Sequence, residues 1–142
     1  MLVSTRGRYA LRVLIDLAAY AQGKYVPMKV VAKRQEISLK YLERIMPALV
    51  KCNLVTGLSG RKGGYKLALP PENIRVGDVL RLTEGSLSPV SCLNKGGCRR
   101  SAECATLPMW QQFQEIANTF FNGVTIGQLV ENIPPLEESE SE

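Results

Sequence analysis

The chain lacks histidine altogether, and it holds only four cysteines among its 142 residues. The absence of histidine excludes serine–histidine triads, cysteine–histidine pairs and imidazole metal ligands. Four cysteines are too few for a scaffold held together by disulfides. No apolar run approaches the roughly 18 residues of a membrane span. Because no substrate site is visible either, we expect a protein that is not an enzyme.

Acidic residues are scarce in the first half of the chain. The whole chain carries 18 Lys and Arg against 13 Asp and Glu, yet residues 1–66 hold 13 basic and only 3 acidic side chains. Residues 67–142 reverse this balance, with 5 basic and 10 acidic side chains. A compact half with a net charge of +10 is typical of a protein that binds DNA, RNA or an anionic membrane surface. The alternative is a basic face that is only solvated.

The N-terminal segment combines arginines with an apolar stretch, as a signal peptide does. Arg12 and Asp16 interrupt that stretch, so an amphipathic helix accounts for it better. We expect the apolar stripe of this helix to face the core, and Arg8, Arg12 and Asp16 to lie on its other side. The chain is then expected to be a cytoplasmic protein with reduced thiols.

The first 83 residues predict a winged helix-turn-helix. Helices are expected over about residues 6–21, 28–35, 39–52 and 76–83, and strands over 54–58 and 65–69. Ser4 and Ser38 are typical N-caps for the first and third helices, whereas Pro47 is awkward inside the third. Because a glycine-rich basic turn separates the two strands, the fold class is mainly α with a small β-hairpin wing.

The second half predicts a sensor segment and a long helix. Over 20 residues with little periodicity precede a helix over about 108–121, and a capping box of Thr125 and Gln128 begins a last short helix. The long helix carries an aromatic stripe of Trp110, Phe113, Ala117 and Phe120, continued by Phe121. This stripe is either core packing or a dimer interface. We divide the chain into a winged helix-turn-helix (1–83), a cysteine-containing loop (84–107), a dimerisation helix with a short C-terminal helix (108–133) and an acidic disordered tail (134–142).

The start of the third helix and the tip of the hairpin are the expected DNA contacts. A helix fits the major groove of B-DNA, and its N-terminal side chains meet base edges. Glu43 either accepts a hydrogen bond from a cytosine amino group or is an ordinary surface acid paired with Arg44 or Lys40. Arg61 and Lys62 suit phosphates or a narrow minor groove. The full expected set is Ser38, Lys40, Tyr41, Glu43, Arg44, Ser59, Gly60, Arg61 and Lys62.

Three of the four cysteines, Cys92, Cys98 and Cys104, repeat at intervals of six positions within the expected loop. Three thiols without histidine do not complete a structural zinc site, whereas soft thiolates suit an iron–sulfur cluster, which normally takes four ligands. The spacing is looser than the best-known ferredoxin patterns, so the residues alone leave a cluster undecided. Cys52 stands apart, and we expect it to be a small buried hydrophobe.

Several stretches together resemble the Rrf-type family of bacterial transcription regulators, in its branch of iron–sulfur cluster regulators (IscR-like). The stretches are 4–10 (STRGRYA), 37–43 (ISLKYLE), 63–65 (GGY) and the three loop cysteines. The resemblance covers about residues 1–133. It implies a homodimeric winged-helix repressor or activator of palindromic promoter DNA, dimerised by the helix at about 108–122. It also implies that Glu43 reads bases, and that Cys92, Cys98 and Cys104 hold a cluster.

The implied cluster is most often two-iron two-sulfur, with four-iron four-sulfur as the alternative, and its fourth ligand is unknown here. Leu107 stands where this branch places a histidine, and Arg8 stands where other relatives use an acidic residue. Ser59 stands where similar wings usually have arginine, a role that Arg61 is expected to take over. If a cluster binds, we expect the loop to become ordered near the DNA-reading unit.

Three alternatives remain beside the cluster-sensing regulator. The first is a cluster-free regulator of the same family that acts through its thiols or through a partner protein. The second is an iron–sulfur electron carrier, which would leave the basic half without a role. The third is a non-specific nucleic-acid binder, which would show no preference among DNA sequences. The expected partners are double-stranded promoter DNA and a second copy of the chain, with no membrane.

Overall fold

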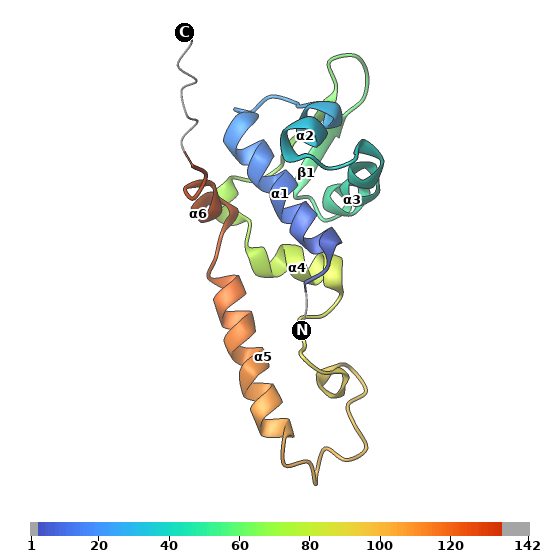
Figure 1. Cartoon of the computed structure of the whole chain (residues 1–142), viewed down its shortest axis with the longest axis vertical. Helices are drawn as coiled ribbons and strands as arrows, with labels where there is room; N and C mark the ends of the chain where they lie inside the picture. Colours follow the sequence, from blue (N-terminus) through green and yellow to red (C-terminus); the bar gives the residue numbers. More distant parts are fainter. Residues whose placement is uncertain (1–2, 135–142) are drawn as a thin grey trace.

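The computed structural model describes residues 3–134 (Figure 1). Ten elements follow one another: α1 (Thr5–Tyr20), α2 (Met28–Gln35), α3 (Leu39–Lys51), β1 (Val55–Leu58), β2 (Gly64–Leu67), η1 (Pro71–Asn73), α4 (Val76–Glu84), η2 (Ser91–Leu93), α5 (Leu107–Asn122) and α6 (Ile126–Val130). The chain is mainly helical with a two-stranded antiparallel hairpin, as expected. Apart from Pro134, the tail expected to be acidic and disordered lies outside the described residues.

The predicted helix starts are confirmed by their caps. The Ser4 hydroxyl accepts a hydrogen bond from the Gly7 amide at 3.1 Å, and the Ser38 hydroxyl accepts one from the Tyr41 amide at 3.1 Å. Both halves of the Thr125–Gln128 capping box are formed. These side-chain oxygens satisfy amides that have no partner within the helix, so the sequence determines where each helix begins.

The core lies between α1, α2 and α3, and it is completed by Val55 of the hairpin, Ile74, Val79 of α4 and Ile126 of α6. α3 stays helical through Pro47, which is exposed. Apolar residues at helical spacing face inward on each of the three helices, and the largest that are fully buried are Val13, Leu14, Leu17, Val31, Leu42, Ile45, Met46 and Leu49. Because α3 buries only this stripe, its opposite face is left free along its whole length.

The hairpin is anchored to the core at its base. β1 and β2 pair from Val55 opposite Leu67 to Leu58 opposite Gly64, and Val26 forms an isolated bridge with Tyr65 on the other side. Gly64 has a φ of +148°, and a Cβ at this position would lie 2.2 Å from the Val26 carbonyl oxygen. Only glycine therefore allows the extended segment at Val26 to close against the hairpin.

Asp16 is a correction to the sequence analysis. We expected it on the outer side of α1, but its relative exposure is 0%. Arg34 donates to both carboxylate oxygens, from Nη2 at 2.7 Å and from Nε at 3.0 Å, and Gln35 Nε2 donates at 3.0 Å. The hydrogen bond to Asp16 raises the pKa of Arg34. The periodicity of α1 predicted an outward carboxylate because it takes no account of Arg34 and Gln35, the partners that α2 brings to Asp16.

The molecule has a head and an arm (Figure 1). The head comprises α1–α4, the hairpin and α6, and the arm is α5, which runs away from the head. α5 is fastened to α4 by Arg81 Nη2, which donates to Asn118 Oδ1 at 3.1 Å and to Asn122 Oδ1 at 2.6 Å. The connection between α4 and α5, residues 85–106, is called the cysteine loop below. Most of it lies at the end of the molecule opposite the hairpin.

The buried pair gives an asymmetric prediction. Arg34→Ala should lower the free energy of unfolding by about 3 kcal/mol, because it leaves a fully buried carboxylate with Gln35 as its remaining donor. Asp16→Asn should cost less, because the Arg34 side chain, 33% exposed, can be hydrated instead. Urea unfolding of both variants measures the difference. Equal losses would contradict the burial argument.

Candidate nucleic-acid interface and cysteine loop

The outer face of α3 carries most of the expected DNA contacts. Lys40, Glu43 and Arg44 are exposed there, as is the N-cap Ser38. Tyr41 is half-buried, because its ring packs edge-on against that of Tyr9 with 5.4 Å between the centroids. Four polar side chains at the start of α3 are therefore free to meet a ligand, and Tyr41 joins them to α1.

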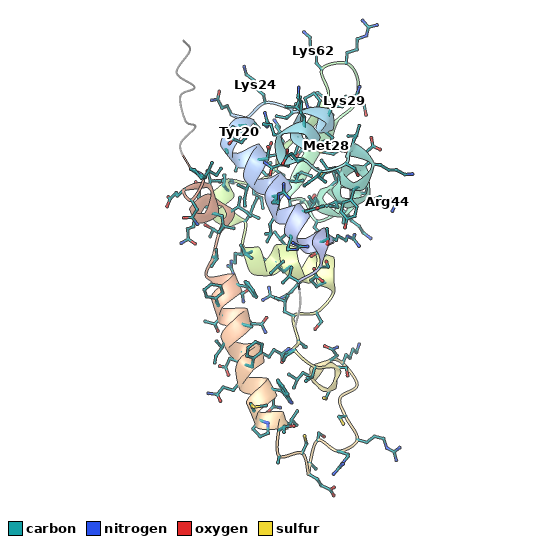
Figure 2. All side chains as sticks on the ribbon, viewed as in Figure 1. Tyr20, Lys24, Met28, Lys29, Arg44 and Lys62 are labelled. Atoms are coloured by element: carbon teal, nitrogen blue, oxygen red, sulfur yellow. The ribbon has the colours of Figure 1, made fainter. Side chains whose placement is uncertain are left out.

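The hairpin tip lies beside α3 and shares a groove with it. Ser59, Gly60, Arg61 and Lys62 are all exposed, and Figure 2 shows Lys62 at the outermost part of the hairpin. An open groove of about 690 Å³ runs between the hairpin and α3. Its lining includes Leu39 and Glu43 from α3, and Ser59, Gly60 and Arg61 from the tip. The structure thus brings together two sets of residues that the sequence analysis had placed on separate elements.

Glu43 has no ion-pair partner among the described residues, although the alternative of an ordinary surface acid requires one. Among residues 3–134 the ion pairs are Arg34 with Asp16 and Arg81 with Asp78, so neither Lys40 nor Arg44 neutralises Glu43. An unpaired acid on the lining of a basic groove is unfavourable for binding phosphates. Its position is consistent instead with a hydrogen-bond acceptor for a base edge.

The sequence analysis missed Lys29 at the same groove. Lys29 follows Pro27 and Met28 at the start of α2, and all three line the groove. Figure 2 shows Lys24 and Lys29 at the end of the head that also carries Lys62. The signal was available, since Pro27 marks the helix start at which an exposed lysine is brought beside the wing.

The cysteine loop does not gather its thiols. Cys98 is exposed, Cys92 and Cys104 are half-buried, and no group of three or more His, Cys, Asp or Glu side chains within residues 3–134 is placed to hold a metal ion. The three thiols fit an iron–sulfur cluster in kind, but they are one ligand short of the usual four and do not lie together in the structure. Most of the loop also lies far from α3 (Figure 1). The expected packing of a cluster-bound loop near the DNA-reading unit stays a prediction.

Two thiols have distinctive surroundings. Cys104 Sγ lies 3.2 Å from Thr106 Oγ1, and hydrogen bonds from the Thr106 side chain and backbone lower the pKa of the Cys104 thiol. Cys52 is exposed, which corrects the expectation of a buried hydrophobe. The reason is that α3 ends at Lys51, so the chain turns away at Cys52 before the apolar stripe returns to the core.

The arm exposes an apolar stripe that differs in part from the one expected. Phe113 and Phe120 are exposed, whereas Ala117 is buried and Trp110 is half-buried. Met109 and Ile116, which the sequence analysis did not include, are 51% and 60% exposed. The four exposed side chains repeat at intervals of three or four residues and so share one face of α5. No helix of the described part of the chain is long and apolar enough to cross a membrane.

Comparison with known proteins agrees with this geometry. The family model Rrf2, described as an iron-dependent transcriptional regulator, matches residues 3–132. The HTH-type transcriptional regulator IscR of Aliivibrio salmonicida (strain LFI1238) is 35% identical over 130 residues, which cover 92% of this chain and 77% of that protein.

Solved structures show the same architecture. T. potens IscR superposes with a TM-score of 0.74 at 30% identity, covering 92% of this chain and 87% of that one. CymR, the global cysteine regulator of B. subtilis, superposes with a TM-score of 0.78 at 28% identity, covering 94% and 99% respectively. The predicted winged-helix fold is therefore confirmed.

Proposed function

Because the chain belongs to the Rrf2 family of transcriptional regulators, we propose that it is a homodimeric regulator of promoter DNA whose cysteine loop senses iron–sulfur or redox status. Such a regulator acts in the cytoplasm, where a bacterial chromosome lies. The observation that carries the DNA-binding part is the groove that Glu43 and Arg61 share. An α-helix with free N-terminal side chains enters a major groove, while a cationic hairpin tip follows the adjacent backbone or minor groove.

The contacts divide by role. Glu43 and Ser38 face the base edges, because they lie at the start of the reading helix and the carboxylate has no cation of its own. Phosphates are neutralised by four cations: Lys40, Arg44, Arg61 and Lys62. Arg61 takes the role of the arginine that similar wings usually carry at the position of Ser59. Tyr41, Ser59 and Gly60 complete the surface by fitting the backbones closely.

The homodimer is supported by the stripe on α5. Phe113 and Phe120 are 45% and 63% exposed, and Ile116 lies between them. A contiguous row of large apolar side chains on a helix that projects from the head is costly in water and is covered when two copies pair. Trp110 lies at the edge of this interface. Ala117 is buried on the side of α5 that faces its own chain.

The cysteine loop is the proposed sensor. Cys92, Cys98 and Cys104 would hold an iron–sulfur cluster, two-iron two-sulfur or alternatively four-iron four-sulfur, with a fourth ligand that the sequence does not identify. The thiols stand apart in this structure, so holding a cluster requires the loop to rearrange. The exposure of residues 94–103 supports this, since few packing contacts oppose such a change.

Two substitutions separate base reading from phosphate binding. Glu43→Ala should change the order of preference among operator variants by about 1–3 kcal/mol at one base pair. Arg61→Ala should weaken binding to all DNA sequences alike. It should also reduce the magnitude of the slope of log K against log salt concentration by about 1. Fluorescence anisotropy titrations at several salt concentrations measure both effects. If Glu43→Ala weakened every duplex equally, Glu43 would not read bases.

A charge on the arm should separate the two copies. Ile116→Asp places a carboxylate in the apolar stripe, whereas Gln111→Asp places the same charge on the far side of α5. The first variant should sediment as a monomer and bind a two-half-site operator on the order of 100-fold more weakly, while the second remains a dimer. Equal behaviour of the two variants in analytical ultracentrifugation would remove this interface.

Anaerobic reconstitution tests the sensor. The wild type should take up iron and sulfide with visible absorbance, and their ratio to protein gives the cluster type. Alanine at Cys92, Cys98 or Cys104 should abolish uptake, whereas Cys52→Ala, outside the loop, should not. A chain that takes up no iron but changes its DNA affinity when its thiols are oxidised would be the cluster-free regulator instead.

A further inference from the structure

Glu84, the last residue of α4, is bonded to the first turn of α1. Its Oε1 accepts hydrogen bonds from the Ser4 amide at 3.1 Å and from the Ser4 hydroxyl at 2.5 Å. The same hydroxyl accepts from the Gly7 amide and so caps α1. A carboxylate at the N-terminus of a helix also interacts favourably with the helix dipole. The residue directly before the cysteine loop therefore fixes the residue that caps α1.

Gly7 makes this close approach possible. A Cβ at position 7 would lie 2.4 Å from Glu84 Oε1 and 3.0 Å from Thr83 Oγ1. Gly7 is buried by these side chains although it lies in the first turn of an otherwise exposed helix end. The sequence thus keeps glycine at the one place where the carboxylate of α4 meets the backbone of α1.

The first two turns of α1 also contact α3. Arg6 lines a shallow pocket of about 260 Å³ together with Tyr41, Arg44 and Ile45. One turn further on, the Tyr9 ring meets the Tyr41 ring edge-on. The start of α1 is therefore held between Glu84 and the part of α3 that is proposed to meet DNA.

The first residues of the cysteine loop, Gly85–Ser88, are connected to the rest of the loop and to α5 as well. Leu87 is buried in a small second core with Val76 and Leu80, against which Val3 and Leu11 also pack. Ser86 Oγ lies 2.9 Å from Asn94 Oδ1, two residues beyond Cys92. In addition, Gln114 Nε2 of α5 donates to Ser88 Oγ at 2.7 Å. Within the described residues, these contacts lead from the neighbourhood of Cys92 to the start of α1.

We propose that Glu84 is a positioning residue that couples the cysteine loop to the DNA-reading head. When Glu84 holds Ser4, the first turn of α1 keeps Arg6 and Tyr9 beside Tyr41. A loop state that pulls residues 85–88 away weakens this hold and lowers the population of the binding-competent head. Coupling of this kind requires that the contact differ between the two loop states. The coupling rests on the proposed function, whereas the positioning of α1 by Glu84 does not.

The first experiment tests the positioning alone, in metal-free protein. Glu84→Ala should bind operator DNA roughly fivefold more weakly, the fold-change that corresponds to the loss of one typical net hydrogen bond. Amide exchange at residues 5–8 should become faster, while exchange in α3 and the hairpin stays unchanged. Glu84→Gln keeps an acceptor oxygen and should recover most of the affinity. Asp78→Ala removes a carboxylate from the exposed side of the same helix and is the matched control.

The second experiment tests the coupling. The ratio of operator affinities between anaerobically reconstituted and metal-free protein is measured for the wild type, Glu84→Ala and Asp78→Ala. The ratio should move toward one in Glu84→Ala and stay at the wild-type value in Asp78→Ala. Ser4→Ala keeps the carboxylate but removes its hydroxyl donor, so it should shift the ratio in the same direction even if Glu84→Ala fails to fold.

The outcomes separate the two proposals. If Glu84→Ala binds DNA within twofold of the wild type with unchanged exchange at residues 5–8, the positioning role is overturned. If it responds to reconstitution as the wild type does, the coupling role is overturned. If the wild type itself shows no change in affinity on reconstitution, sensing through a cluster fails and the coupling role fails with it, whereas the positioning role still depends on the first experiment.

Discussion

The fully buried carboxylate of Asp16 constrains how the head is assembled. It accepts from Arg34 and Gln35, so α1 and α2 meet in one orientation that satisfies its oxygens. Arg12 of α1 also reaches the main-chain carbonyl of Gln35, at the end of α2. Because a turn of only a few residues joins α2 to α3, this arrangement also determines where α3 lies. An ion pair with 0% exposure on the acid side thus controls the placement of a surface that is exposed.

The proposed DNA-reading surface and the proposed sensor loop are separated in space and are joined at a narrow region. The hairpin and α3 occupy one end of the molecule, and most of the cysteine loop occupies the other, with α5 alongside (Figure 1). Three groups of contacts tie the start of the loop to the head and arm: Glu84 with Ser4, Leu87 in the second core, and Ser88 with Gln114. A change in the remainder of the loop can affect α3 through these contacts, through α5 and its hydrogen bonds to Arg81, or through a second copy of the chain.

Most of the fold could be predicted from local patterns, because capping and periodicity are local. Ser4, Ser38 and Thr125 cap the helices that their sequence context predicts, and the hairpin strands lie within one or two residues of their expected ends. Partners that are distant in sequence could not be predicted. The burial of Asp16 and the inward position of Ala117 on α5 each depend on a neighbouring element that periodicity does not include. The exposure of Cys52 depends on the end of α3 at Lys51. Residues on both sides of the groove between α3 and the wing were predicted from the sequence, but the groove itself and the place of Lys29 in it required the structure.

The attachment of the cysteine loop through a few residues has a consequence for how such proteins diversify. Substitutions, insertions or a different set of ligands between residues 89 and 106 leave the packing of the head untouched. If the loop is the sensor and α3 reads the operator, as proposed, a lineage can exchange one sensory chemistry for another while its operator sequence stays the same. The same property makes the segment suitable for transplantation: a foreign loop grafted between Ser88 and Leu107 would inherit the existing output, provided that Glu84 and Leu87 stay in place.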